Sequence, residues 1–261
     1  MEVKFVPVAA YPAVVESLAA DRLDLAWLGG FTFVQVHLKD PSATPLVQRE
    51  QDAQFTSKFI TANPDVKSLA DLKGKRVAVT KAAGSHYLLI QALAKAGLGF
   101  KDITPAYLIP ADGRAAFENG KVDAWVTWDP YVASAQRQQN ARILADGSEL
   151  ASYQRYYLAG SDYAKAHPEV LQQVYQALRE IGAWTKANPA AAARVLGPLW
   201  GNLDSATVQQ ANGRRSYDVQ PVQLDNLGEQ QRIADAFYRE GLLPKPVDAR
   251  AVTVFEPHAA D

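Results

Sequence analysis

Apolar residues occur along the chain in short runs separated by segments with helical spacing. Residues 3–6 and 23–27 form apolar runs of strand length, and residues 13–20 and 31–38 have the apolar spacing of helices. Further strands are predicted at 44–49 and 55–61. Strands that alternate with helices in this order are typical of a parallel sheet, so the pattern predicts an α/β fold.

The same alternation returns after residue 73 and is followed by a helical part. The predicted elements of this second block are a strand ending at Val79, a helix 84–96, a strand 104–109, a helix 111–118, a strand 122–126 and a helix 131–138. After a strand at 153–159, helices are predicted from Pro168 and from Pro189, since proline favours the first helical position. Asp204 and Asp225 are predicted N-caps of two later helices.

One pattern is written twice in the chain. Residues 15–31 and 116–131 each carry a helix, a short polar turn, an apolar strand and an aromatic-rich turn. Ligands of open α/β sheets bind beyond the carboxyl ends of strands, so two such strand ends predict two walls of a cleft. We therefore expect two lobes joined by a hinge: residues 1–75 plus 154–261, and residues 76–153.

A candidate anion site lies where the strand ending at Val79 gives way to a helix. Gly84, Ser85, His86 and Tyr87 open that helix. The first N–H groups of a helix and its dipole favour a negative charge, and a serine hydroxyl and a histidine N–H add further donors. The alternative is that Ser85 only caps the helix and Tyr87 packs in the core.

The second corner of the same lobe follows the strand 122–126. Trp128 stands at a strand-to-helix corner, where a large ring can cover the organic part of a ligand. Asp129 is a second candidate, although Asp129 and Pro130 also suit the start of a helix. Arg114 can meet an anion, or it can be solvated or paired with an aspartate.

The first lobe offers the equivalent corner. Trp27 corresponds to Trp128, and the two glycines that follow permit close approach of a ligand to the backbone. The candidate ligand-binding residues of this lobe are Tyr11, Trp27, Gly29, Gly30, Phe31 and Thr32.

Composition narrows the classes of function. The net charge of −1 gives no field that would recruit nucleic acid. The chain has no cysteine, which excludes disulfides, a thiolate nucleophile and cysteine zinc sites. Its four histidines lack metal-binding spacing, and no nucleophile elbow or Walker loop is present. We therefore expect no catalysis, no metal and no cofactor.

Several segments together carry a resemblance to a known family. Between residues 73 and 246 the chain resembles the aliphatic-sulfonate and taurine receptors among the periplasmic solute-binding proteins of ABC importers. The segments that carry it are 71–79, 85–89, 110–117, 122–131 and 229–237. Residues 1–70 are instead similar to phosphonate and phosphite receptors, through Tyr11, 14–18 and 23–29.

The resemblance implies a type II two-lobed periplasmic binding protein without that family's first strand and helix. It implies capture of a small organic oxyanion, most simply an alkanesulfonate, by closure of the lobes and delivery to a membrane permease. A periplasmic monomer is expected. The alternatives are a phosphonate or phosphite receptor, and more remotely a thiamine-pyrimidine-synthase-like enzyme, whose cysteine motifs this chain lacks.

Overall fold

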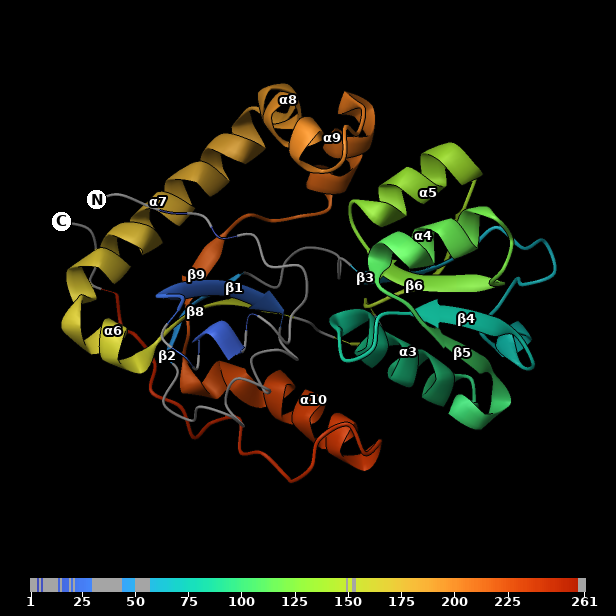
Figure 1. The fold of residues 1–261 in the computed structure, drawn as a ribbon, viewed down its shortest axis with the longest axis horizontal. Helices are drawn as coiled ribbons and strands as arrows, with labels where there is room; N and C mark the ends of the chain where they lie inside the picture. The colour runs from blue at the N-terminus through green and yellow to red at the C-terminus, as the bar shows by residue number, and fades with distance from the viewer. Residues whose placement is uncertain are drawn as a thin grey trace. The chain divides into compact units, whose positions relative to one another are not determined.

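The fold is taken from a computed structural model (Figure 1). It describes residues 4, 6, 14, 16–18, 20, 22–29, 44–49, 57–148, 150–151 and 154–257. Contacts between Cα atoms divide the chain into two compact units. Unit 1 comprises residues 1–50, 154–184 and 217–261, and unit 2 comprises residues 51–153 and 185–216.

Unit 2 is built on a five-stranded sheet in the order β5-β4-β6-β3-β7. Its strands are β3 (Ser57–Thr61), β4 (Arg76–Val79), β5 (Thr104–Tyr107), β6 (Ala124–Trp128) and β7 (Arg142–Asp146). β4 runs parallel to β5 and β6, whereas β3 is antiparallel to β6 and β7. The parallel order predicted for the second block is therefore correct for β4, β5 and β6, whereas β3, a strand of the first predicted block, enters this sheet from the other end.

Helices cover both faces of this sheet (Figure 1). The helix α3 (Gly84–Lys95) packs on one face through its apolar residues Leu88, Leu89, Ala92 and Leu93. On the other face are α4 (Pro110–Glu118) and α5 (Tyr131–Gln139), which pack around the buried ring of Trp125. Because β4 and β6 are parallel, α3 and α5 both begin at the carboxyl ends of the strands.

The helices α8 (Pro189–Leu199) and α9 (Ser205–Gly213) complete unit 2. α9 contacts both α8 and α5. The Asp204 side chain accepts the Thr207 N–H at 3.0 Å, which confirms Asp204 as the N-cap of α9. The short 3-10 turns of the chain are η1 (Ala70–Leu72), η2 (Phe100–Asp102) and η3 (Leu224–Leu227).

Unit 1 contains a four-stranded sheet in the order β1-β8-β2-β9. The strands are β1 (Leu25–Gly29), β2 (Thr44–Arg49), β8 (Arg155–Ala159) and β9 (Val219–Pro221), and each paired neighbour is antiparallel. The parallel sheet predicted from the first block is therefore wrong for the described pairs, because β8 lies between β1 and β2. Its helices are α6 (Ser161–Ala166), α7 (Pro168–Ala187) and α10 (Gly228–Arg239). The side chains of Leu171 and Tyr175 on α7 pack against Ala159 and Val219.

The unit boundaries differ from the expected lobes at two places. Residues 51–75 group with unit 2 because β3 pairs with β6 and β7, and residues 185–216 group with unit 2 because α9 packs on α5. That the two units move as lobes stays a prediction. Asp225 was expected to cap a helix, and this is wrong: it lies within η3, and Leu227 is the N-cap of α10.

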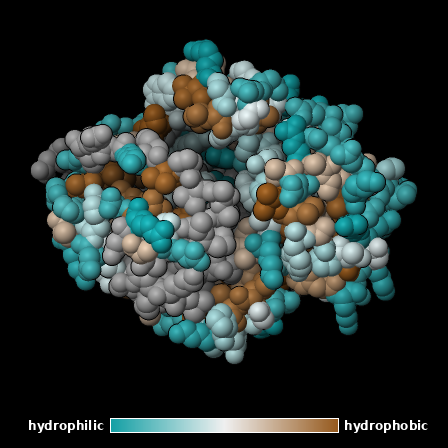
Figure 2. Space-filling view, viewed as in Figure 1, coloured by the Kyte–Doolittle hydropathy of each residue, from teal (hydrophilic) through white to brown (hydrophobic). Residues whose placement is uncertain are grey.

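The surface drawn in Figure 2 carries separate apolar patches among hydrophilic residues. Large exposed apolar side chains in the described part of the chain include Trp27, Tyr107 and Ile109. Within the described ranges, no helix is both long and apolar enough to cross a bilayer.

Candidate functional site

The first turn of α3 forms the core of the candidate site in unit 2. Ala83 is the N-cap residue, and its carbonyl accepts the N–H groups of His86 at 2.9 Å and Tyr87 at 3.3 Å. The amides of Gly84 and Ser85 precede any acceptor within the helix. Two N–H groups at the positive end of the helix dipole are thus left for another partner.

Ser85 adds a hydroxyl to this helix start. The residue is 0% exposed, and its Oγ has no hydrogen-bond partner within the described part of the chain. A buried hydroxyl group without a hydrogen bond costs about 1–3 kcal/mol of folding free energy, so the unpaired Ser85 hydroxyl marks a candidate ligand contact. Capping does not explain Ser85, since Ala83 is the N-cap and no side chain caps α3. Tyr87 is buried, as its core alternative requires.

His86 holds the loop that precedes α3. Its Nδ1 accepts the backbone N–H of Ala82 at 3.1 Å, and Ala82 has a left-handed φ of 60°. A non-glycine residue in that region is strained, so this hydrogen bond stabilises an unfavourable turn. The ring packs edge-on against Phe100 and Tyr107. Burial, with the charge of Lys81, lowers the pKa of His86 from 6.5 to about 4, which keeps the ring neutral at pH 7.

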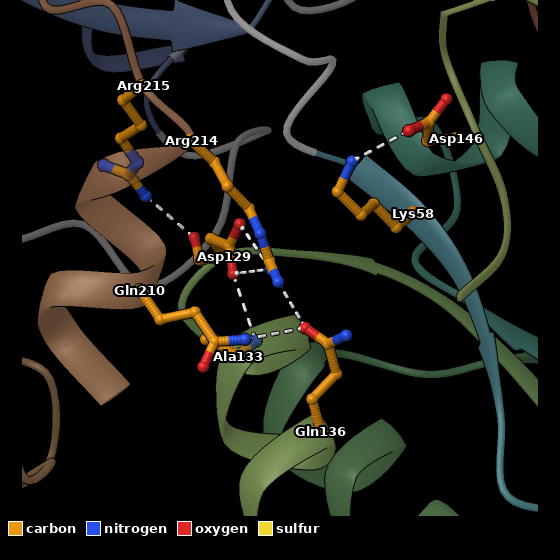
Figure 3. A network of polar contacts seen from close by, with 8 residues as sticks. All are labelled: Lys58, Asp129, Ala133, Gln136, Asp146, Gln210, Arg214 and Arg215. Atoms are coloured by element: carbon orange, nitrogen blue, oxygen red, sulfur yellow. Dashed lines mark hydrogen bonds and ion pairs between the residues drawn. The ribbon is translucent and has the colours of Figure 1, made fainter. Parts of the chain in front are cut away.

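Asp129 lies at the corner after β6 and is the centre of a polar network (Figure 3). Nη1 of Arg214 lies 3.0 and 3.2 Å from its two carboxylate oxygens, and Arg215 donates to its backbone oxygen at 2.8 Å. The same carboxylate accepts the N–H of Ala133 at 3.1 Å, which caps the first turn of α5. Asp129 thus satisfies an N–H of the first turn, but the N-cap of α5 is Pro130, so the prediction of Asp129 as N-cap and Pro130 as first helical residue is wrong by one position. Arg214 is an addition that the sequence did not predict.

Burial and charge act in opposite directions on Asp129. Burial raises the pKa of its carboxyl group, and the charge and hydrogen bonds of Arg214, with the charge of Arg215, oppose the rise. Gln136 extends the network, because its Oε1 accepts from Arg214 and, at 3.0 Å, from Gln210. These contacts join the end of α9 to α5.

The other predicted residues of unit 2 have ordinary partners. Trp128 is half-buried and its ring meets that of Tyr131 edge-on at 6.2 Å between centroids. Arg114 donates to Glu118 at 2.7 Å and to Gln138 at 3.0 Å on an exposed surface between α4 and α5. Arg114 is thus paired, but with Glu118 and not with the aspartate that the paired alternative expected.

Lys58 and Thr127 were not among the predicted site residues. They are directly paired across β3 and β6, at the end of the sheet where β6 stops. Lys58 is fully buried and its Nζ lies 3.3 Å from Asp146, while the buried Thr127 Oγ1 has no partner within the described residues. Figure 3 draws the contact between Lys58 and Asp146. The signal available in the sequence was a lysine within an apolar strand pattern.

In unit 1, the structure describes one predicted side chain of the site. Trp27 is 40% exposed, and the guanidinium carbon of Arg155 lies 5.1 Å from its ring centroid. Gly29 ends β1 and pairs with Arg155 of β8. The predicted contributions of Tyr11, Gly30, Phe31 and Thr32 lie outside the described residues. Arg155 was not predicted from the sequence.

The described residues contain no group of three or more histidine, cysteine or acidic side chains that could hold a metal. What the site in unit 2 offers is a set of neutral donors at a helix start, next to a corner whose carboxylate is already paired. Such a surface suits an anion that only accepts hydrogen bonds.

Comparison with known proteins identifies the family of the chain. The sequence model of the family described as "ABC transporter, phosphonate, periplasmic substrate-binding protein" matches residues 1–197. The chain belongs to the periplasmic substrate-binding proteins of ABC transporters.

Relatives of this substrate-binding protein support the assignment. A protein of Escherichia coli (strain K12) named for aliphatic sulfonate binding is 35% identical over 251 residues, which cover 95% of this chain and 78% of the relative. The crystal structure of the periplasmic aliphatic sulphonate binding protein SsuA from Escherichia coli matches with a TM-score of 0.84 and 33% identity, over 97% of this chain and 82% of that one.

A second solved structure agrees. The alkanesulfonate-binding protein SsuA from Xanthomonas axonopodis pv. citri, bound to MOPS, matches with a TM-score of 0.84 and 32% identity, over 95% of this chain and 86% of that one. These matches confirm the predicted fold class, the type II periplasmic binding protein, and the role of substrate-binding component of an ABC importer.

Proposed function

We propose that this substrate-binding protein captures a small aliphatic sulfonate and delivers it to an ABC permease. The observation that carries the proposal is the buried Ser85 hydroxyl, which has no partner in the described chain and lies in the first turn of α3. Together with the amides of Gly84 and Ser85 it would bind the sulfonate oxygens. The relatives named for aliphatic sulfonates support the same ligand class.

The protonation chemistry of the ligand supports sulfonate over phosphonate. A sulfonate is a fully ionised monoanion that accepts hydrogen bonds and donates none, whereas a phosphonate monoanion also carries an O–H group that needs an acceptor. The carboxylate of the neighbouring corner, Asp129, is taken up by Arg214 and by the Ala133 amide. We therefore assign Asp129 a positioning role for the Trp128 corner instead of a ligand contact.

Aromatic side chains would cover the organic part of the ligand. Trp128 in unit 2 is half-buried and is the last residue of β6, and Trp27 in unit 1 is 40% exposed and lies in the middle of β1. An apolar chain gains stabilisation from contact with such rings. Tyr11, Gly29, Gly30, Phe31 and Thr32 remain part of this proposal for unit 1.

A phosphonate or phosphite receptor is the second candidate. It is favoured by the description of the family whose sequence model matches residues 1–197. We further propose a non-catalytic, periplasmic monomer that binds no nucleic acid. The absence of cysteine from the sequence argues against the cysteine-dependent enzymes that share features with this family.

A thermal-shift screen tests the ligand class. Each of an alkanesulfonate, an alkylphosphonate, sulfate and phosphite is added at increasing concentration, and the unfolding midpoint is measured. A ligand that binds only the folded protein raises the midpoint as its concentration exceeds Kd. We expect the alkanesulfonate to give the largest rise. A larger rise with the alkylphosphonate or phosphite would replace the sulfonate proposal by the second candidate.

A further inference from the structure

Thr127, near the carboxyl end of β6, carries a buried hydroxyl group that makes no hydrogen bond. The residue is 1% exposed, and its Oγ1 has no partner among the residues that the structure describes. Buried polar groups are nearly always hydrogen-bonded in native proteins, because a group that leaves water without a new partner destabilises the fold. An unpaired hydroxyl at this place therefore calls for a reason, and contact with a ligand is one.

Other buried threonines of unit 2 use their hydroxyl groups within the fold. Thr61, on the neighbouring strand β3, donates to the backbone oxygen of Asp123 at 2.7 Å. Thr207, in the first turn of α9, donates to the carboxylate of Asp204 at 2.6 Å. Both residues are 0% exposed. Thr127 differs from them, since its hydroxyl group is just as enclosed but contributes no hydrogen bond to the fold.

The strand pairing places Thr127 just beyond the end of a neighbouring strand. β4 and β6 are paired as far as Val79 and Val126, so Thr127 lies one residue past their last pair. On the other side of β6, Thr127 is still paired with Lys58 of β3, whose Nζ lies 3.3 Å from Asp146. At Thr127 the sheet therefore continues on the β3 side and has ended on the β4 side.

The chain that leaves β4 leads directly to the start of α3. Only residues 80–83 separate the end of β4 from Gly84, and α3 contacts both β4 and β6. Because these strands are parallel, the first turn of α3 and Thr127 lie at the same end of the sheet, where ligands of open α/β sheets bind. Within the described part of unit 2, Ser85 and Thr127 are the residues whose buried hydroxyl oxygen lacks a partner.

The two hydroxyl groups belong to opposite faces of the sheet. Side chains alternate along a strand, and Trp125 packs with residues of α4 and α5, whereas Val126 packs with residues of α3. Thr127 is thus on the face of Trp125, and Ser85 belongs to the helix on the other face (Figure 1). A tetrahedral anion beyond the strand ends turns different oxygens toward the two faces, so each hydroxyl group can address its own oxygen.

We propose that Thr127 is a further ligand-binding residue of unit 2, whose Oγ1 donates a hydrogen bond to a sulfonate oxygen that the first turn of α3 does not bind. This inference rests on the proposed function, in which Gly84 and Ser85 bind the sulfonate group. A sulfonate has three equivalent oxygens, and each accepts hydrogen bonds. The start of α3 binds the oxygens on its own side, and the Thr127 hydroxyl group binds the oxygen on the opposite side.

Thr127→Val removes the hydroxyl group and keeps the shape of the side chain. Calorimetric titration of the full chain with ethanesulfonate should show a Kd raised by about tenfold to a hundredfold, because a hydrogen bond to a charged group is lost. The urea midpoint of the ligand-free variant should stay unchanged or rise, since no hydrogen bond within the described chain is broken. Thr127→Ser keeps the hydroxyl group and should return Kd to within about threefold of the wild-type value.

Thr61→Val is the matched control in the same sheet. The Thr61 hydroxyl group is bonded to Asp123, just before the start of β6 and thus at the opposite end of that strand, so this variant should lower the urea midpoint and leave Kd unchanged.

The outcomes separate this inference from the proposed function. An unchanged Kd in Thr127→Val overturns the role of Thr127, and so does a raised Kd that Thr127→Ser does not restore. A raised Kd together with a lowered urea midpoint overturns it as well, since the hydroxyl group would then stabilise the fold. In each of these cases sulfonate binding by the wild-type protein stands. If the wild-type protein does not bind ethanesulfonate, the proposed function fails and this inference fails with it.

Discussion

The guanidinium of Arg214 and the carboxylate of Asp129 form the most enclosed ion pair among those recorded for the described residues, with N–O distances of 3.0 and 3.2 Å. The Asp129 side chain is 0% exposed and that of Arg214 is 13% exposed. Removing one member of such a pair leaves a charge without compensation in a poorly solvated place. The pair therefore fixes the end of α9 against the corner that carries Trp128.

Substitution of Arg214 by methionine should lower the free energy of unfolding by about 3 kcal/mol, because the Asp129 carboxylate stays buried without its partner. Chemical denaturation at pH 7 measures the change. Arg114→Met is the control, since the Arg114–Glu118 pair is exposed and should contribute less than about 1 kcal/mol. Equal losses in the two variants would show that Arg214 acts only as a surface residue.

Of the two residues of this ion pair, only Asp129 could be recognised as a candidate from the sequence. Asp129 was recognised as a candidate helix cap because a cap and its helix are neighbours in the sequence, and the bond to Ala133 spans four residues. Arg214 comes from a helix 85 residues later. No periodic pattern links the two positions, so only the packing of α9 on α5 shows that they meet.

The same contrast holds for the proposed ligand-binding residues. The start of α3 at Gly84 was predicted, because the apolar spacing of Leu88, Leu89 and Ala92 and the preceding strand determine it locally. Arg155 was not predicted, because it meets Trp27 only through the register of β1 against β8. Register depends on the pairing partner of a strand, which one sequence does not show.

His86 should make the stability of the protein dependent on pH. The ring takes up a proton near pH 6.5 in the unfolded chain and only near pH 4 in the folded protein. The unfolded chain therefore binds more protons between these values, and folding stability is lost as the pH falls through this window. Between pH 7 and pH 4.5 the contribution of His86 should amount to about 2 kcal/mol.

Denaturation of His86→Asn at both pH values checks this expectation, because an asparagine oxygen can still accept the Ala82 N–H but does not titrate. The loss of stability on acidification should be smaller in this variant than in the wild-type protein. His167→Asn serves as control, since the His167 side chain is 48% exposed. A loss in His86→Asn as large as in the wild-type protein would assign the acid sensitivity to other groups.

Gly182 on α7 permits close contact with the segment that follows α9. A Cβ atom at this position would lie 2.1 Å from the backbone oxygen of Tyr217. Backbone cannot rotate away as a side chain can, so Gly182→Ala should lower the free energy of unfolding by about 2 kcal/mol or more. Gly213→Ala is the matched control on α9, where nothing lies within 4 Å of the added atom.

The control should leave stability within about 0.5 kcal/mol or increase it, because alanine favours a helix over glycine. Urea denaturation of both variants gives the comparison. If Gly182→Ala is as stable as the wild-type protein, the segment at Tyr217 can shift without loss and the close contact has no structural role.

Trp128→Ala should weaken binding of an alkanesulfonate by about 1–3 kcal/mol, the usual contribution of a buried aromatic contact. Trp128→Phe retains a ring at the corner and should recover part of the loss. Calorimetric titration of both variants measures the difference. Unchanged affinity in a folded Trp128→Ala protein would assign Trp128 to the packing against Tyr131 alone.

Ser85→Ala separates a binding role from a structural one. The Ser85 Oγ has no hydrogen-bond partner in the described chain, so its removal breaks no bond of the ligand-free protein and should leave the free energy of unfolding unchanged or higher. A hydrogen bond to a charged group contributes about 1.5–3 kcal/mol, so affinity for an alkanesulfonate should fall by about tenfold to a hundredfold.

Ser161→Ala is the control, because Ser161 Oγ is likewise buried without a partner in the described residues but belongs to unit 1, at the start of α6. Its substitution should leave sulfonate affinity unchanged. If Ser85→Ala lowers stability but not affinity, the hydroxyl supports the fold, and the sulfonate oxygens are bound elsewhere.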